Sequence, residues 1–331
     1  MSRPAVELVC PAGTPAALRA AVDAGADTVY LGFRDATNAR NFPGLNFSRE
    51  ELADGVTYAH ARGVTVYVAV NTFPGAGEPG PWHAAIDDAA TYGADAVIVA
   101  DIGLLAYAAE THPDLRRHLS VQASASNAEA LKFYHREFGI KRAVLPRVLT
   151  VPEIAALTEQ VPVECEVFLF GGLCPMAEGR CLLSSYVTGV SPNRNGACSP
   201  ASHVRYVERG GTLATRLGDL TVNVFQENEP AGYPTLCKGR FHAGGCEASY
   251  LFEEPASLSM VEMLPDLVAA GVKALKIEGR QRGRAYVSEV VGSMRRALDA
   301  CLAGTPPPAG DMQRFLEGRR ETTGAYRKTW R

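Results

Sequence analysis

One short unit recurs along this chain and limits what it can fold into. A helix-like segment ends at a glycine, two or three residues follow, and a run of aliphatic residues then begins. The unit occurs at Gly25, Gly63, Gly93, Gly139 and Gly271. Glycine just past a helix end tolerates the left-handed conformation that closes the last turn. Continuous aliphatic runs are typical of parallel strands that are buried on both faces, so the unit predicts a parallel β/α fold.

Capping signals mark where the intervening helices begin. Thr14 precedes Pro15, which fits an N-cap followed by proline at the first helical position. A serine or threonine followed three residues later by glutamate is the capping-box pattern. Pairs of this kind are Ser48 with Glu51, Ser126 with Glu129, and Thr150 with Glu153.

Eight aliphatic runs are predicted as strands. They are residues 6–9, 28–31, 65–70, 96–100, 119–122, 143–145, 163–170 and 274–277. Eight strands, mostly separated by helices, predict an α/β fold of the closed (β/α)₈ TIM-like barrel type. A doubly wound open sheet is the alternative. No Gly-x-Gly-x-x-Gly pattern follows the first strand, which disfavours dinucleotide binding by such a sheet.

The seventh and eighth predicted strands are unusually far apart. We interpret residues 171–272 as a cysteine-rich insertion between the last two strands, with Gly210 and Gly211 as a hairpin turn. Residues 1–303 then form the barrel with its insertion, and 304–331 form a C-terminal tail. The basic and aromatic end of that tail, which includes Tyr326 and Trp330, is predicted to pack at an edge. Active sites of such barrels lie where the strands end, so the insertion can build or cover one.

Charge and hydropathy narrow the class of protein. The net charge of −3 offers no general basic excess for binding nucleic acid. We expect no transmembrane segment, because no apolar run is long enough, and no signal peptide. The expected location is therefore the cytoplasm, where cysteines stay reduced. Eight cysteines in such a chain predict a use other than disulfides.

Four of these cysteines form the candidate metal site. They are Cys174, Cys181, Cys198 and Cys237. Four thiolates are the usual ligands of a 4Fe-4S cluster and also of structural zinc. The residues alone do not decide between such a site and buried free thiols, and Cys246 competes with Cys237 for the fourth position. Cys10, Cys165 and Cys301 fall within predicted strands or a helix and are interpreted as core residues.

Polar residues just after predicted strands are the candidates for substrate contact. They are Asn71, Asp101, Gln122, Ser124, Arg147, Glu278 and Arg280. Arg147 and Arg280 could clamp a carboxylate, and Glu278 or Asp101 could transfer a proton. A structural ion pair between Glu278 and Arg280 is the alternative. Glu178 and Arg180 lie between two of the candidate cysteines and are expected to orient that loop or to touch substrate.

Several motifs together resemble the collagenase-like ("unclassified") peptidase family, and in particular its ubiquinone-biosynthesis branch. The matching segments are 8–13, 37–40, 44–47, 120–124, 144–147, 178–181, 196–200, 233–240 and 276–280. They cover almost the whole chain in one order. Residues 241–250, which include Cys246, are not a clean match.

The resemblance implies a function and a cofactor. It implies a 4Fe-4S cluster on Cys174, Cys181, Cys198 and Cys237. It also implies a heterodimer with a UbiV-like barrel protein that hydroxylates the ring of ubiquinone precursors without O₂. A small carboxylate resembling prephenate is the implied oxygen donor.

Three other functions stay open. Relatives in the family hydroxylate RNA bases, although the balanced charge of this chain counts against that substrate. Peptidase activity finds no support, since neither a Gly-x-Ser-x-Gly elbow nor a His-Glu-x-x-His motif is present. A non-catalytic scaffold with a structural cluster is the third alternative.

Overall fold

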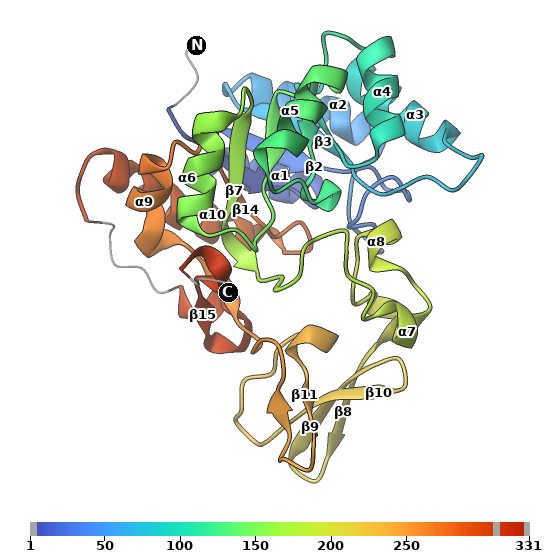
Figure 1. Cartoon of the computed structure of the whole chain (residues 1–331), viewed down its shortest axis with the longest axis vertical. Helices are drawn as coiled ribbons and strands as arrows, with labels where there is room; N and C mark the ends of the chain where they lie inside the picture. The colour runs from blue at the N-terminus through green and yellow to red at the C-terminus, as the bar shows by residue number, and fades with distance from the viewer. Residues whose placement is uncertain (1–4, 307–311, 328–331) are drawn as a thin grey trace.

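The computed structural model describes residues 5–306 and 312–327 and confirms the (β/α)₈ barrel (Figure 1). Its eight parallel strands are β1 (Glu7–Pro11), β2 (Thr28–Leu31), β3 (Thr65–Val70), β4 (Ala96–Val99), β5 (Arg116–Leu119), β6 (Arg142–Val144), β7 (Glu164–Gly172) and β14 (Ala274–Ile277). Each strand pairs with the next, and β14 pairs with both β1 and β7, which closes the sheet. Because a closed sheet has no free edge, the doubly wound alternative is wrong.

Eight helices surround the barrel. They are α1 (Pro15–Asp23), α2 (Arg49–His60), α3 (Gly80–Thr91), α4 (Ile102–Thr111), α5 (Ala128–Phe138), α6 (Val151–Gln160), α9 (Leu264–Ala269) and α10 (Arg284–Leu302). The apolar faces of these helices and the outward side chains of the strands form one large core. Cys10 and Cys165 lie in this core and Cys301 packs against it, as predicted. Within the described residues, no helix has both the length and the apolar character needed to cross a bilayer.

The barrel interior carries charges that the sequence analysis did not predict. Arg142 is fully buried, and its guanidinium lies 2.8 Å from Glu7 and 3.4 Å from Glu166. The Lys276 ammonium lies 2.6 Å from the second oxygen of Glu166. Buried charges are tolerated only when they are paired in this way. The network lies below the mouth of the barrel and leaves the strand ends free for a site.

One predicted strand was misplaced. Residues 119–122 were expected to form the fifth strand, but β5 ends at Leu119, and a 3₁₀ turn follows under the Ser120 cap. The actual strand was missed because it reads as polar, Arg116 to Leu119. The Arg117 side chain is nevertheless buried, since it donates hydrogen bonds to backbone carbonyls, among them those of Phe138 and His112.

The helix caps agree with the sequence in all but one case. Thr14 caps α1, and the boxes at Ser48 and Thr150 are both formed. The predicted box at Ser126 is wrong. The α5 helix begins one residue later, and the Asn127 Oδ1 accepts a hydrogen bond of 2.8 Å from the amide of Ala130.

This difference gives a first prediction. Asn127→Ala should lower the free energy of unfolding by about 1 kcal/mol, because it removes a cap from a free helix end. Ser126→Ala is the matched control and should cost only a few tenths of that amount. Urea denaturation of both variants measures the difference. An equal loss in both would contradict the assignment of Asn127 as the cap.

The stretch 171–272 builds two small sheets that project from the barrel (Figure 1). The first holds β8 (Val204–Arg209), β9 (Thr212–Leu217) and β10 (Leu220–Phe225), and the second β11 (Arg240–Phe241) and β12 (Ser249–Tyr250). The short helices α7 (Ser185–Thr188) and α8 (Pro192–Asn195) precede them. The hairpin predicted at Gly210 and Gly211 is confirmed by the antiparallel pairing of β8 with β9. The last part of the stretch returns to the barrel as α9.

The described part of the tail, residues 312–327, packs on the barrel. Strand β15 (Glu321–Thr322) pairs with β13 (Ser257–Ser259), which itself pairs antiparallel with β7. Tyr326 is buried, and its hydroxyl donates to the Phe168 carbonyl at 3.4 Å. Trp330 lies outside the described residues.

Candidate functional site

A buried ion-pair network lies where the strands of the barrel end. Arg147, which follows β6, extends one guanidinium nitrogen to Glu178 and the other to Glu278. Its contact with Glu278 is 2.6 Å long. Glu278 follows β14, and Glu178 lies in the loop after β7, so three separate segments meet at this one guanidinium. The same guanidinium stacks 3.4 Å from the centre of the Phe168 ring.

Glu278 is held in its ionised form by two arginines. A second one, Arg40, lies 2.9 Å from its other carboxylate oxygen. Burial alone would favour the neutral acid, but the Arg147 and Arg40 guanidiniums outweigh it and hold the pKa of Glu278 at about 2. Glu178 differs, because burial raises its pKa although Arg147 acts against that rise. One guanidinium therefore joins two carboxyl groups whose pKa values are shifted in opposite directions.

Arg280 does not form the ion pair with Glu278 that the sequence analysis considered. It donates a 3.2 Å hydrogen bond to the Asn38 side chain and makes no ion pair with Glu278 within the described residues. Burial lowers its pKa to about 10. Glu278 does form structural ion pairs, but with Arg147 and Arg40. The two arginines expected to clamp a substrate carboxylate thus have different surroundings, since Arg147 already binds two carboxylates of the protein itself.

The other residues predicted from the sequence have separate structural roles. Asp101 caps α4 by accepting a 3.0 Å hydrogen bond from the Leu104 amide, so its proton-transfer role stays a prediction. Asn71 accepts from the Ala39 amide at 3.0 Å and thereby fixes the 37–40 loop. Ser124 ends the 3₁₀ turn in the left-handed conformation.

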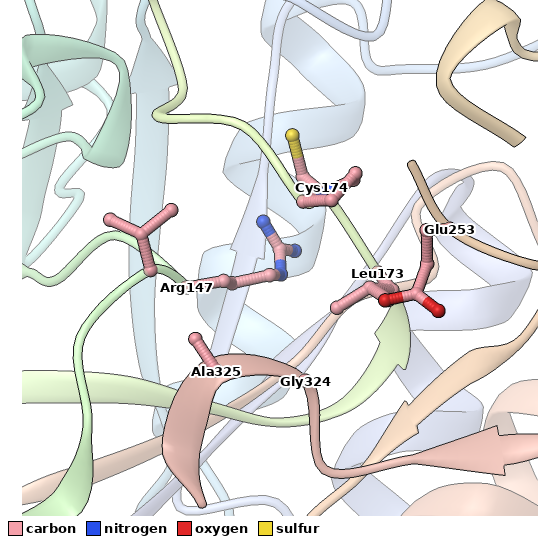
Figure 2. A pocket seen from close by; sticks show the side chains of 8 residues that line it. Arg147, Leu173, Cys174, Glu253, Gly324 and Ala325 are labelled. Carbon is pink, nitrogen blue, oxygen red and sulfur yellow. The ribbon is translucent and has the colours of Figure 1, made fainter. Parts of the chain in front are cut away.

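Three buried polar atoms at the mouth have no hydrogen-bond partner among the described residues. They are Nε of Arg147, Oε2 of Glu178 and Oε1 of Gln122. Buried polar atoms are usually paired, so such a group points to a binding region for water or ligand. A small cavity of about 20 Å³ adjoins it, lined among others by Arg147, Cys174 and Ala325 (Figure 2). That volume suits about one water molecule.

The four candidate cysteines form one electrostatic group. Burial, followed by the neighbouring Cys198 and Cys181 thiols, raises the pKa of Cys237 to about 11. Burial and the Glu178 carboxylate raise the pKa of Cys174, and Cys237 acts in the same direction. Each of the four therefore influences another, although they come from loops up to 63 residues apart in sequence, from 174 to 237. All are free thiols.

The remaining cysteines are placed elsewhere. Cys246 is exposed in the turn between β11 and β12, whereas Cys237 is half-buried and within electrostatic reach of the other three. Cys10, Cys165 and Cys301 belong to the barrel core or its edge. The arrangement thus separates the four candidate ligands from the other four thiols.

The type of metal centre on these four thiols stays a prediction. Within the described residues, no three Cys, His, Asp or Glu side chains approach closely enough to hold one metal ion. Zinc–sulfur bonds of about 2.3 Å would require the sulfurs to crowd around one point. A 4Fe-4S cluster is larger and holds its four thiolates farther apart. The four thiols are the type of ligand that such a cluster takes.

Two glycines allow the cysteine loops to pack on the barrel. Gly179 and Gly196 both have positive φ, 76° and 69°. A Cβ at Gly179 would collide with the Gln122 carbonyl, and one at Gly196 would collide with the Ala39 side chain. The loop that carries Cys181 therefore rests directly on the 120–124 segment, and the loop that carries Cys198 rests on the 37–40 segment.

A buried ion-pair network lies at the mouth of a TIM-like barrel, and four candidate cysteines lie in the 171–272 stretch beside it, which defines a class of barrel protein with a thiol-rich insertion. The family comparison is specific: the model of peptidase family U32 matches residues 13–326, and the chain belongs to this family. The tRNA hydroxylation protein P of Haemophilus influenzae is 32% identical over 91% of this chain and 69% of its own length. The 23S rRNA 5-hydroxycytidine C2501 synthase of Escherichia coli is 31% identical over 96% of this chain and 42% of its own.

A solved structure adds only a distant likeness. The U32 peptidase Mk0906 matches with a TM-score of 0.41 at 18% identity, over 50% of this chain and 68% of its own. The family membership confirms the coarse resemblance found from the sequence. The names of the two relatives support an enzyme.

Sequence reasoning missed two members of the site. Arg40 and Asn38 hold Glu278 and Arg280, yet neither follows an aliphatic run directly. The available signal was the 37–40 motif, which contains both residues. Lys238 is a further example, because it is buried beside Cys237 and its ammonium lies 2.6 Å from Glu317 of the tail.

Proposed function

We propose that this chain is the iron–sulfur subunit of an O₂-independent hydroxylase that acts on the ring of a ubiquinone precursor. The electrostatic influence of Cys198 and Cys181 on Cys237, and of Cys237 on Cys174, beside the Arg147 network supports this proposal above any other observation. A UbiV-like barrel protein is the proposed partner, following the resemblance to UbiU in the motifs around these cysteines. The hydroxylating relatives support the reaction type.

The residues of the chain have definable parts in such a reaction. When bound, a 4Fe-4S cluster supplies single-electron transfer. Arg147 fixes Glu178 and Glu278 at the mouth, where burial excludes water from their contacts. Replacing a ring hydrogen by a hydroxyl group oxidises the ring by two electrons, so a donor such as a small hydroxylated carboxylate, or a separate acceptor, must be reduced equally. Arg280 and the unpaired Nε of Arg147 are the cationic groups available for such a carboxylate.

The test is a gene deletion in the organism that carries this chain, grown without O₂. We expect ubiquinone to fall to background while hydroxylated nucleosides in RNA stay unchanged, both measured by mass spectrometry. Wild-type chain should restore ubiquinone, and Cys198→Ala should not. Unchanged ubiquinone under these conditions would overturn the proposal.

A second function has its own supporting observation. The two relatives named above act in RNA hydroxylation according to their names, and they match more than nine-tenths of this chain. If the deletion removed a hydroxylated nucleoside and left ubiquinone intact, an RNA base would be the substrate. Salt-dependent binding of RNA by the purified chain would support the same conclusion.

A further inference from the structure

A second recess lies at the mouth of the barrel and takes no part in the network above. It has a volume of about 260 Å³ and is lined by Ala36, Thr72, Phe73, Trp82, Arg194 and Asn195. These residues come from the loops after β2 and β3, the start of α3, and α8 of the cysteine-rich stretch. We propose that this recess binds a small planar acid, in which a flat ring carries a carboxylate or phosphate group.

The Trp82 indole forms one wall of the recess and is held in place by hydrogen bonds. The Trp82 indole N–H donates a 2.9 Å hydrogen bond to the Thr72 hydroxyl, which in turn donates at 2.6 Å to the Ala36 carbonyl. Trp82 also packs against the barrel core, and Thr72 is buried. The indole is therefore held before any ligand arrives. Together with Phe73 it offers the apolar surface on which a ring can stack.

An exposed guanidinium supplies the second binding element of the recess. Within the described residues, no carboxylate lies within ion-pair distance of Arg194, although Gly75 lies beside both the Arg194 guanidinium and the Glu78 carboxylate. The α8 backbone is tied to the opposite wall, since the Phe73 amide donates to the Arg194 carbonyl at 3.3 Å. An arginine beside aromatic rings binds planar oxyanions well, because its fork of N–H donors matches a carboxylate or phosphate.

The absence of one side chain makes room for this guanidinium. A Cβ at Gly75 would lie 2.8 Å from an Nη atom of Arg194. Gly75 has no positive φ, so alanine fits its backbone. Gly75→Ala should therefore displace the guanidinium while leaving the charge and the fold intact. This variant separates the position of the arginine from its presence.

The recess adjoins the first site but does not depend on a metal. Ala36 and Arg40 belong to one loop, and Arg40 contacts Glu278. Asn195 directly precedes Gly196, which rests on Ala39. Binding of the acid can thus be measured on the chain whether or not cysteines hold a cluster, and its failure would leave the proposed function untouched.

Tryptophan fluorescence provides the experiment, because the chain has only Trp82 and Trp330. In a Trp330→Phe background, titration with benzoate, phenyl phosphate and neutral benzyl alcohol should quench Trp82 with one or both anions. Benzyl alcohol should bind about tenfold more weakly or worse, since it lacks the charge that Arg194 recognises. Quenching by benzoate alone assigns a carboxylate, and quenching by phenyl phosphate alone assigns a phosphate.

Variants decide whether Arg194 is responsible. Arg194→Gln should weaken binding of the anion about tenfold, and Gly75→Ala should weaken it by a smaller factor. Arg205→Gln, on β8 outside the recess, is the matched control and should leave affinity unchanged. Ligand-observed NMR on the wild-type chain repeats the measurement if Trp330→Phe fails to fold. Absence of binding by both anions, or equal affinity in Arg194→Gln, would overturn the proposal.

Discussion

Arg147→Met is expected to lower the free energy of unfolding by about 3–5 kcal/mol, because it leaves two buried carboxyl groups without their shared cation. Arg147 is 5% exposed and reaches Glu178 and Glu278 together. Methionine keeps most of the side-chain volume, so the loss reports on charge more than on packing. Chemical denaturation at neutral pH measures it.

The effect should depend on pH with a defined sign. In the wild type, the pKa of Glu278 is lowered from 4.5 to about 2, so its contribution to stability is present above pH 4.5 and is lost as the pH falls towards 2. Without Arg147, the pKa of this carboxyl is lowered less, because Arg40 then opposes the effect of burial with less help, and the variant gains by protonation at a higher pH than the wild type. The stability difference between wild type and variant should therefore be widest at neutral pH and narrow below pH 4.5.

Two further variants show whether the loss of stability in Arg147→Met comes from charge or from packing. Arg40→Met should cost less than Arg147→Met, because Arg40 is more exposed and contacts one of the two carboxylates. The double variant Arg147→Met with Glu278→Gln should recover part of the loss, since one unpaired charge is removed. A pH-independent loss, or no recovery in the double variant, would show that Arg147 acts by packing.

The second large effect concerns metal content. Replacing Cys174, Cys181, Cys198 or Cys237 with alanine should each reduce bound iron and sulfide to on the order of a tenth of the wild-type content or less. Each replacement removes one of the four proposed ligands, whose thiols influence one another electrostatically. The measurement is iron and sulfide analysis after anaerobic purification, together with the visible absorption spectrum.

Matched replacements of the other cysteines supply the control. Cys165→Ala and Cys301→Ala change the barrel core or its edge, and Cys246→Ala changes an exposed turn. All three should keep the colour of the wild type. If Cys246→Ala lost iron while Cys237→Ala retained it, the ligand set would have to be revised.

The barrel could be predicted because its evidence is local. Glycine at helix ends, aliphatic strands and capping boxes each act over a few residues, and the closing pair of β14 with β7 follows from having eight such units. The error at β5 arose because Arg117 and His118 are polar residues on a buried strand. Their burial depends on carbonyl groups and rings from other elements, which no local pattern contains.

The site could be predicted only as a list of candidates. Position after a strand indicated Arg147 and Glu278, which the structure brings into one ion pair, but it did not indicate which other side chains meet them. The partners Glu178 and Arg40 come from loops whose paths depend on packing, such as the close approach of Gly196 to Ala39. For the same reason the recess around Trp82 and Arg194 had no signal in sequence, because its walls lie more than 100 residues apart, at 82 and 194.

The most direct test of the central claim is to purify the wild-type chain without O₂ and count iron and acid-labile sulfide. A 4Fe-4S cluster on the four cysteines predicts about four of each per chain and a brown protein that bleaches on exposure to air. A colourless protein with one zinc ion and no sulfide, or with no metal at all after anaerobic reconstitution, would contradict it.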